Sequence, residues 1–454
     1  MEQERKEQSV QDKSIFALTW PIYIDHMLGY FVGFVDVFLL SQISDHASAA
    51  VGAVNVIVLF VIMLLGALGI GGGVIYSQYL GANKQDAVRR LYASAFVLNM
   101  AVGIVTSLIL VLLSDSLASW IGLNGVLHEY GKTYLAIVGG GTFFYAGTTF
   151  FWGIMSANGY THYTMYVAVA TNVINIIGVY ALTFGYFGLP KLGIIGIALA
   201  TVIARIVGFL YSWWLVRYKL KIQFIWAKDG FLTNTKVMIR TVFAITLEPV
   251  FWYGAQLVAT AIIASIGPDE LAARTYTVTV TSFVSLFCYS VSQGTQILIS
   301  HLVGAMRTDQ VKRQFRQSLL IGTGVPIIML TLIYAMSESI IGVFTKNQDI
   351  IAISTMLLLL AFVNEPGSGF NQVTGSALRA AGHVNYPTVI GGIFMWGMFI
   401  PMAYILAIPL GLGVVGVFIS MAFDELVRGL LLYRKWSHVI RSPLQLKLES
   451  TLAH

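Results

Sequence analysis

Apolar residues gather in long stretches along the 454-residue chain, and polar residues or Gly, Pro and Asn mark the breaks between them. A helix needs about 20 mostly apolar residues to cross the hydrocarbon core of a bilayer. The pattern predicts an all-α polytopic membrane protein with twelve transmembrane helices, at residues 15–40, 50–76, 91–114, 132–156, 163–186, 192–216, 240–266, 275–303, 317–337, 350–376, 387–408 and 412–434.

Composition supports this interpretation. Apolar residues make up 57% of the chain and charged residues 11%, with a mean hydropathy of +0.77. Soluble domains contain roughly 45 to 50% apolar and about 25% charged residues, so an ordinary soluble protein is excluded. Cys288 is the single cysteine, which rules out an internal disulfide and makes thiol or zinc chemistry unlikely. The charged start of the chain, residues 1–14, gives no sign of a signal peptide.

Basic residues are distributed unevenly over the predicted loops. If alternate loops face opposite sides, one side carries 22 of the 27 Lys and Arg residues, including Arg379 and Arg428, and the other side carries four. Arg205 is the remaining one and lies inside a span. Because cytoplasmic loops are enriched in Lys and Arg, we expect both termini in the cytoplasm. The net charge of +6 then follows from topology, and nucleic acid is not an expected partner.

The two halves of the chain resemble each other when the numbering is shifted by a constant amount. This shift takes Gly71 to Gly294, and we call it the repeat offset. Gly71–Arg90 and Gly294–Arg313 share seven of 20 positions, and the repeat offset also aligns Asp25 with Glu248. An even number of spans in each half predicts parallel repeats, whose substrate and ion sites lie near the bilayer midplane. The expected domains are a cytoplasmic segment (1–14), an N-lobe (15–216), a cytoplasmic linker (217–239), a C-lobe (240–434) and a cytoplasmic tail (435–454).

Four acidic residues lie well inside predicted spans: Asp25, Asp36, Glu248 and Glu365. Each costs at least about 2.5 to 3.5 kcal/mol at the centre of a helix in lipid. Asp25 and Asp36 are separated by about three helical turns and therefore share one helix face. Such an acid is either neutralised by a fixed partner such as Arg205, or it exchanges H⁺ or binds Na⁺.

Proline follows two of these acids directly, as Pro249 and Pro366. Proline removes a backbone N–H and frees a carbonyl about one turn earlier, so each Glu-Pro step is a candidate cation site and hinge, or else an ordinary kink. Three aromatic residues, Phe251, Trp252 and Tyr253, follow the first step and are candidates for cation–π contact with a flat organic cation.

Two further features favour structural interpretations. The repeat offset aligns Arg205 with Arg428, which lies near Asp424 and Glu425, and we expect a structural ion pair there. The glycine-rich run Gly66–Gly73 lies in an apolar span without a βαβ context, so close helix packing explains it better than nucleotide binding.

Motifs for enzymatic chemistry are missing from the sequence. There is no Walker motif, zincin helix or nucleophile elbow, and the eight histidines are scattered. We therefore expect no enzyme and no cofactor. Transport would draw on an ion gradient of H⁺ or Na⁺.

Several segments together resemble the multidrug and toxic compound extrusion (MATE) transporters of the MOP flippase superfamily. They are Pro21 and FVDVFLL in the first span, SQYLGA after the second, NVINIIG in the fifth and GSALRAAG near the end of the tenth. The resemblance implies a V-shaped pair of six-helix lobes, working as a monomer in the bacterial plasma membrane, that exports organic, often aromatic cations in exchange for H⁺ or Na⁺.

The resemblance also implies site residues. Asp36 matches the family's first-span acid, with Asn175 and Thr201 as polar partners in an N-lobe cation site. Glu248 and Glu365 look like the acid pair that NorM-type members place in the C-lobe. A Na⁺ site is thus expected at Asp36 or at the Glu248/Glu365 pair, and Pro21 joins Pro249 and Pro366 as a candidate hinge.

Two departures and three alternatives remain. Val179 stands where the family often has an acid or amide, and Ala361 stands where NorM-type proteins can have a tyrosine. These departures favour H⁺ over Na⁺ as the coupling ion. A lipid-linked precursor flippase would need a basic cavity, yet Arg205 is the only embedded basic residue. A narrower metabolite substrate remains an alternative. A major-facilitator carrier would have a basic loop motif after the second span, and this chain lacks it.

Overall fold

The computed structural model describes residues 10–42, 45–226 and 231–441, and all regular elements in these ranges are helical. Most of the expected N-terminal segment, residues 227–230 of the expected linker and most of the expected C-terminal tail lie outside the described residues. Asp36 lies within a described helix, but its side chain is also outside the description.

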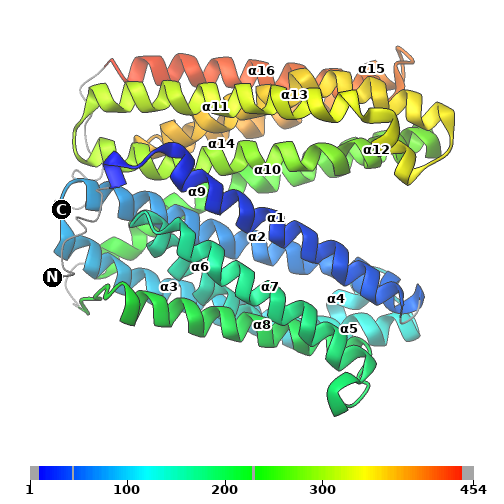
Figure 1. Ribbon diagram of the computed structural model, residues 1–454, viewed down its shortest axis with the longest axis horizontal. Helices are drawn as coiled ribbons and strands as arrows, with labels where there is room; N and C mark the ends of the chain where they lie inside the picture. Colours follow the sequence, from blue (N-terminus) through cyan, green and yellow to red (C-terminus); the bar gives the residue numbers. More distant parts are fainter. Residues whose placement is uncertain (1–9, 43–44, 227–230, 442–454) are drawn as a thin grey trace. The chain divides into compact units, whose positions relative to one another are not determined.

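The first repeat begins after a short turn, η1 (Val10–Asp12). Its described helices (Figure 1) are α1 (Ile15–Ser41), α2 (Asp45–Gly81), α3 (Gln85–Leu112), α4 (Ser114–Trp120), α5 (Val126–Gly140), α6 (Thr142–Ala157), α7 (Thr161–Phe184) and α8 (Ile194–Trp214). A 3₁₀ turn, η2 (Tyr186–Gly188), follows α7, and a π-helical turn, η3 (Leu215–Lys219), extends α8.

The second repeat comprises α9 (Phe231–Ile266), α10 (Pro268–Gly304), α11 (Thr308–Ala335), α12 (Ser337–Phe344), α13 (Gln348–Ala380), α14 (Asn385–Phe394), the π-helical turn η4 (Met395–Phe399), α15 (Ile400–Ala407) and α16 (Gly413–Val439).

The helices account for the twelve predicted spans. Ten of the helical stretches in the described part of the chain are long and apolar enough to cross a membrane. The span predicted at 132–156 is divided between α5 and α6, and the last one is α16, which carries five charged residues. Several helices extend past their apolar windows, as α2 does at both ends, because polar residues continue a helix beyond the hydrocarbon core.

Helix boundaries repeat at the same shift as the sequence does. The starts of α2 and α10, of α3 and α11, and of α4 and α12 are each separated by the repeat offset, and so are the ends of α6 and α13. The internal duplication is therefore also a duplication of structure. One difference interrupts it: Gly141 separates α5 from α6 in the first repeat, whereas α13 is continuous in the second.

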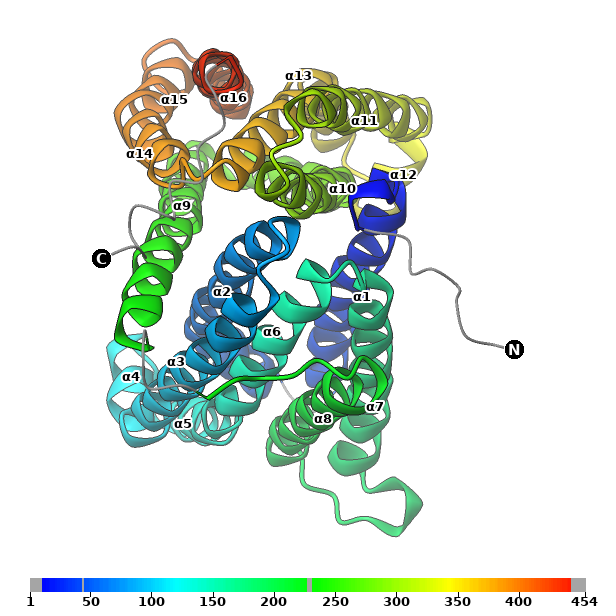
Figure 2. The same ribbon diagram turned by 90° about the vertical axis from the view of Figure 1, so that its left-hand side faces the viewer.

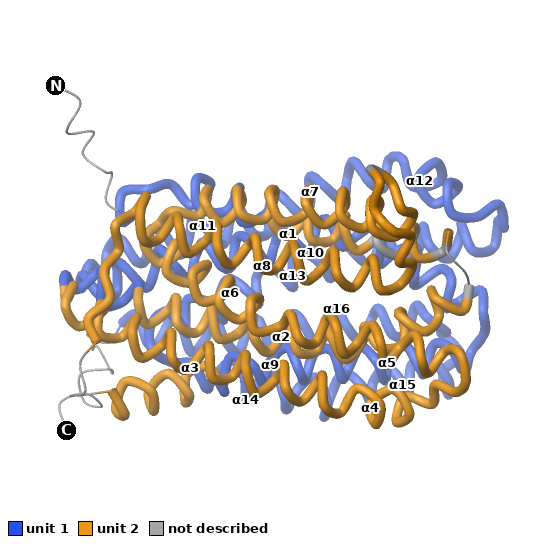
Figure 3. The backbone as a smooth tube through the Cα atoms, turned by 90° about the horizontal axis from the view of Figure 1, so that it is seen from below, with its two compact units in different colours: residues 1–23, 77–83, 243–454 blue, residues 24–76, 84–242 orange. Residues whose placement is uncertain are grey.

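Helix packing divides the chain into two compact units (Figure 3): unit 1 comprises residues 1–23, 77–83 and 243–454, and unit 2 comprises residues 24–76 and 84–242. These limits differ from the expected lobes, because the start of α1 and the end of α2 pack with the second repeat. In unit 1, α13 packs against α10, α11 and α16, and in unit 2, α8 packs against α5, α6 and α7 (Figure 2).

Glycines allow two close helix contacts. In unit 2, a Cβ on Gly69 of α2 would lie 2.5 Å from the Thr149 carbonyl of α6, so the run Gly66–Gly73 serves helix packing as predicted. In unit 1, a Cβ on Gly81 would overlap the carbonyl of His301, and a Cβ on Gly304 would overlap that of Gln78. Gly81/Gly304 and Gln78/His301 are both equivalent pairs of the repeat, so this contact between the ends of α2 and α10 is reciprocal.

Candidate ion-coupling site

Glu365 occupies the middle of α13 and is 5% exposed. Ser285 of α10 donates a hydrogen bond of 2.7 Å from its hydroxyl to Oε2 of Glu365. Pro366 follows inside the helix and lacks the N–H that would bond the carbonyl one turn earlier. The carboxylate is therefore buried next to a neutral donor and a weakened stretch of helix.

Asn364 stands directly before this acid. Its side chain is 2% exposed, and within the described residues neither its amide oxygen nor its amide nitrogen has a hydrogen-bond partner. Buried polar groups are rarely left without partners. A polar partner such as a water molecule would stabilise this amide.

A second polar group lies between α13 and α16, and we call it the α16 network. Arg428 donates to Oδ2 of Asp424 and to Oε1 of Glu425, at 2.7 Å each, and Asn371 donates to Oε2 of Glu425, also at 2.7 Å. The three charged side chains are 4 to 6% exposed. The ion pair predicted at Arg428 is confirmed.

The α16 network carries an excess of negative charge. It combines two carboxylates with one guanidinium, and Oδ1 of Asp424 has no partner in the described structure. With Glu365 on the neighbouring turns of α13, unit 1 holds three buried acids and one buried base in this region. Burial of uncompensated charge is expensive, so bound H⁺ or another cation would stabilise it.

Glu248 has a fixed partner. Arg379, in the last turn of α13, donates from Nη1 to Oε2 of Glu248 at 2.7 Å, and the two side chains are 12% and 27% exposed. Arg379 also bonds Gln296 and Ser376. Arg379 was expected in a loop but lies in the last turn of α13, whereas Arg428 lies inside its predicted span.

The expected acid pair in the second repeat is not assembled. Arg379 lies almost four helical turns after Glu365 on α13, a rise of about 21 Å at 1.5 Å per residue. Glu248 is at the Arg379 end, and Glu365 bonds Ser285 instead. The expectation of one site formed by both carboxylates was wrong, because matching spans in sequence does not fix their depth.

Asp25 has a neutral partner in unit 2. Trp152 of α6 donates from Nε1 to Oδ2 of Asp25 at 3.2 Å, and both side chains are partly buried. Arg205 does not pair with Asp25 in the described contacts; its Nη1 donates to the carbonyl of Val138 at 2.8 Å, and its guanidinium lies 5.8 Å from the centre of the Tyr145 ring.

Two of the three residues of the expected N-lobe site have described side chains. Asn175 of α7 donates from Nδ2 to the Thr201 hydroxyl of α8 at 3.4 Å, and Oδ1 of Asn175 is buried without a partner in the described structure. These two residues do meet, while the side chain of Asp36 is not described. Whether the acid joins them stays a prediction.

The three aromatic candidates do not form one surface. Phe251 packs against Gly392 in the core of the second repeat, whereas Trp252 and Tyr253 are 38% and 60% exposed and lie edge to face. Pro21, Pro249 and Pro366 lie inside α1, α9 and α13, where a missing N–H weakens each helix.

Sequence reasoning missed the partners of the acids: Ser285, Asn371, Arg379 and Trp152. A signal existed for two of them. Trp152 and Arg379 both lie on the fourth span of their repeats, and the repeat offset places them about one helical turn apart. Because the offset also aligns Asp25 with Glu248, the two acids could have been predicted to have partners on equivalent helices. Ser285 and Asn371 gave no such signal, since small polar residues are common in these helices.

Two segments, residues 21–181 and 244–405, match the family model MatE. The chain belongs to the MatE family. The starts of the two matches are separated by the repeat offset, in agreement with the internal duplication. As a member of this family, the protein is a multi-pass membrane transporter of small molecules and not an enzyme.

Similar proteins extend over nearly the whole chain. "Uncharacterized transporter YisQ" of Bacillus subtilis is 35% identical over 426 residues, 93% of each chain. "Probable multidrug resistance protein NorM" of Thermotoga maritima is 25% identical, covering 92% of this chain and 90% of the relative. A MOP superfamily transporter from Pyrococcus furiosus has the same fold, with a TM-score of 0.85, 16% identity and coverage of 97% and 100%.

Proposed function

We propose that this MATE transporter exports organic, often aromatic cations across the bacterial plasma membrane in exchange for H⁺ or Na⁺. In this proposal both termini are cytoplasmic and the protein works as a monomer. The observation that carries it is Glu365, a buried carboxylate inside a membrane helix whose described partner is a neutral hydroxyl.

Charge explains why such a residue couples two fluxes. A bare carboxylate in this environment costs at least about 2.5 to 3.5 kcal/mol, and either H⁺ or a cationic compound removes that penalty. Because one negative charge accepts one of them at a time, the ion entering releases the compound. Alternating access then follows if the two states expose Glu365 to opposite sides, and Pro366 supplies a weak point in α13 for that change.

Glu248 and the α16 network have different roles in this proposal. Glu248 is neutralised by Arg379, so it stabilises the structure unless the pair opens during the cycle. Asp424 and Glu425, linked to α13 through Asn371, hold a negative potential around Glu365. In the first repeat, Asp36 with Asn175 and Thr201 would form a separate cation site.

Relatives named as multidrug resistance proteins support export of several compounds. A lipid-linked precursor flippase is the second candidate, and the embedded guanidinium of Arg205 favours it as a contact for an anionic group. A transporter for one metabolite is a third, since the relative with 35% identity is itself uncharacterised.

The test is export of a fluorescent lipophilic cation from proteoliposomes of known orientation. A pH gradient and a Na⁺ gradient are applied separately to the wild type, Glu365→Gln, Asp36→Asn and a control, Glu338→Gln, whose side chain is exposed on α12. We expect one gradient to drive export, Glu365→Gln to fall to the level of protein-free liposomes, and Glu338→Gln to match the wild type.

The outcomes separate the candidates. Export that persists in Glu365→Gln would remove this acid from the coupling mechanism, and loss in Asp36→Asn alone would move coupling to the first repeat. No export of the cation under either gradient would contradict the antiporter and favour the flippase or a narrower substrate.

A further inference from the structure

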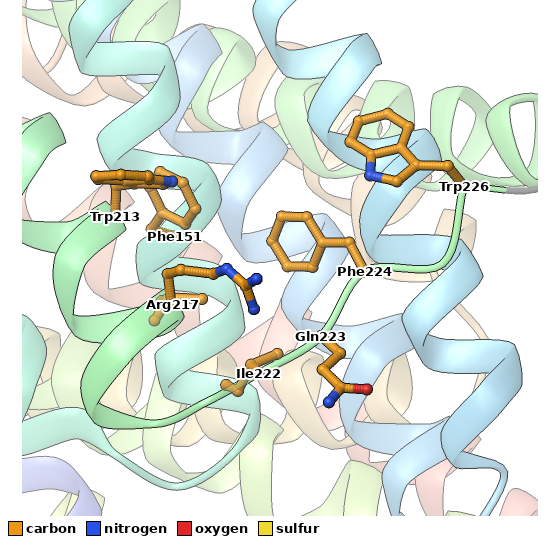
Figure 4. Close-up of a pocket in the computed structure, with 8 residues that line it drawn as sticks. Phe151, Trp213, Arg217, Ile222, Gln223, Phe224 and Trp226 are labelled. Carbon is orange, nitrogen blue, oxygen red and sulfur yellow. The ribbon is translucent and has the colours of Figure 1, made fainter.

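A cavity of about 430 Å³ opens in unit 2 where α8 ends (Figure 4). This volume lies within the usual range for small-molecule sites, roughly 300 to 1,000 Å³. It lies between α6, the π-helical turn η3 and the extended segment 220–226, and its lining is Phe151, Trp213, Val216, Arg217, Ile222, Gln223, Phe224 and Trp226. None of these residues belongs to the candidate ion-coupling site.

Arg217 gives the cavity its charge. Its guanidinium points across the cavity toward Phe224 (Figure 4). Among the described residues, the lining contains no acid and Arg217 makes no side-chain hydrogen bond or ion pair. Lys219 and Lys221 are exposed close by in sequence. A guanidinium suits a phosphate group, which it can hold through two hydrogen bonds, and the same charge repels a cationic cargo.

Aromatic side chains give the cavity an apolar wall. Trp213 and Trp226 are 43% and 64% exposed, and they flank the side and the rim of the cavity in Figure 4. Tryptophan is enriched at the level of the lipid headgroups, where one part of the ring is wet and the other is in lipid. The cavity thus joins a site for a phosphate to surfaces suited to glycerol and upper acyl chains.

The cavity is built before any ligand arrives. Backbone hydrogen bonds fix the segment after η3: Leu220 N–H to Leu215, Ile222 N–H to Val216, and Ile225 N–H to the Arg89 carbonyl of α3. Phe224 packs edge to face on Phe150, at 6.0 Å between ring centres. Little ordering is therefore required when a ligand binds.

We propose that this cavity binds the phosphate headgroup of an anionic phospholipid from the cytoplasmic leaflet. Arg217 holds the phosphate, and Trp213 and Trp226 contact the glycerol and the start of the acyl chains. Basic pockets between helices at the cytoplasmic surface are known to bind anionic headgroups. The proposal rests on the proposed topology but not on the cargo or the coupling ion. Free inorganic phosphate shares the chemistry, and the test distinguishes it from the lipid.

Native mass spectrometry of the delipidated full-length protein tests the proposal by measuring which lipids the protein retains. Phosphatidylglycerol, phosphatidylcholine with the same acyl chains, and inorganic phosphate are added separately. We expect the wild type to retain one phosphatidylglycerol in preference to phosphatidylcholine. Arg217→Gln should lower phosphatidylglycerol affinity at least about fivefold, which corresponds to about 1 kcal/mol for one basic residue at an anionic membrane surface.

Matched variants make the result specific. Lys219→Gln removes the same charge from the same turn but outside the cavity lining and should keep the wild-type preference; Arg217→Lys should keep part of it. Equal losses in Arg217→Gln and Lys219→Gln would overturn the proposal in favour of diffuse attraction. Equal binding of both lipids would also overturn it. Displacement of phosphatidylglycerol by an equal concentration of inorganic phosphate would overturn it as well and would indicate a site for a free anion.

Discussion

The fourth spans of the two repeats fold alike but differ at one place. In the first repeat Gly141 ends α5, and the next residue, Thr142, bonds the Ser107 hydroxyl at 2.7 Å. The repeat offset puts Asn364 and Glu365 at these positions, inside a continuous α13. A neutral hydroxyl pair in one repeat thus corresponds to a buried carboxylate in the other, so duplicated structure does not carry duplicated chemistry.

Two other equivalent pairs show the same principle. Asp25 and Glu248 both have partners on the fourth span, yet one partner is the neutral Trp152 and the other the charged Arg379. Arg205 bonds a backbone carbonyl, while Arg428 bonds two carboxylates one turn earlier. In these two pairs the residues of the first repeat bond neutral groups and those of the second repeat bond opposite charges, whereas Glu365 of the second repeat bonds the neutral Ser285.

The arginine pair offers the largest expected effect. Arg428→Gln leaves Asp424 and Glu425 buried without a counter-charge and should lower the free energy of unfolding by about 3 to 5 kcal/mol. Arg205→Gln loses one charge-assisted hydrogen bond, about 1.5 to 3 kcal/mol. Thermal unfolding in detergent compares them. Equal losses would mean that the two repeats do not differ in the way described.

Arg379→Gln should come next, with a loss of about 3 kcal/mol, because its partner Glu248 stays partly buried. Adding Glu248→Gln removes the remaining charge and should recover much of the stability. Arg434→Gln, at an exposed position on α16, is the control. If the double variant is less stable than Arg379→Gln alone, the acid has other partners and the pair is not the reason for its burial.

Trp152→Phe tests the equivalent acid of the first repeat. It keeps most of the aromatic packing and removes the donor to Asp25, which should cost about 1.5 to 3 kcal/mol in thermal unfolding. Adding Asp25→Asn should abolish the difference between tryptophan and phenylalanine at this position. A difference that persists would assign the effect to ring packing.

The smallest effect concerns a pair that the second repeat lacks. Lys132 lies 2.8 Å from Asp115, and its hydrogen bond and charge lower the pKa of this carboxyl, with a minor contribution from His128. A lowered pKa stabilises the fold above the unfolded value of about 3.9, and the contribution is lost as the pH falls through the folded pKa. Lys132→Gln should therefore melt slightly below the wild type at about pH 6, and this difference should shrink as the pH falls below about 3.9. The equivalent positions in the second repeat are Glu338 and Thr355, so Thr355→Val should show no such pH dependence.

Sequence was sufficient for the helical architecture, because the length of the spans follows from the thickness of the bilayer and the repeat offset follows from duplication. It did not predict the break at Gly141, since glycine is also common inside these helices, as at Gly69. It identified the embedded acids but not the partners of three of them, because Ser285, Trp152 and Arg379 become neighbours only through packing. It also ended the tenth span at residue 376, before the end of α13 at Ala380, so Arg379 was placed in a loop.

The reciprocal contact of Gly81 with residue 301 and of Gly304 with residue 78 has a further meaning. An interface in which residue i meets j while j meets i is the form that two identical subunits adopt around a twofold axis. Here both surfaces are on one polypeptide. A six-helix ancestor with this sequence would have presented the same self-complementary patch to a second copy of itself, so the fused gene makes permanent an association that two separate chains could have formed.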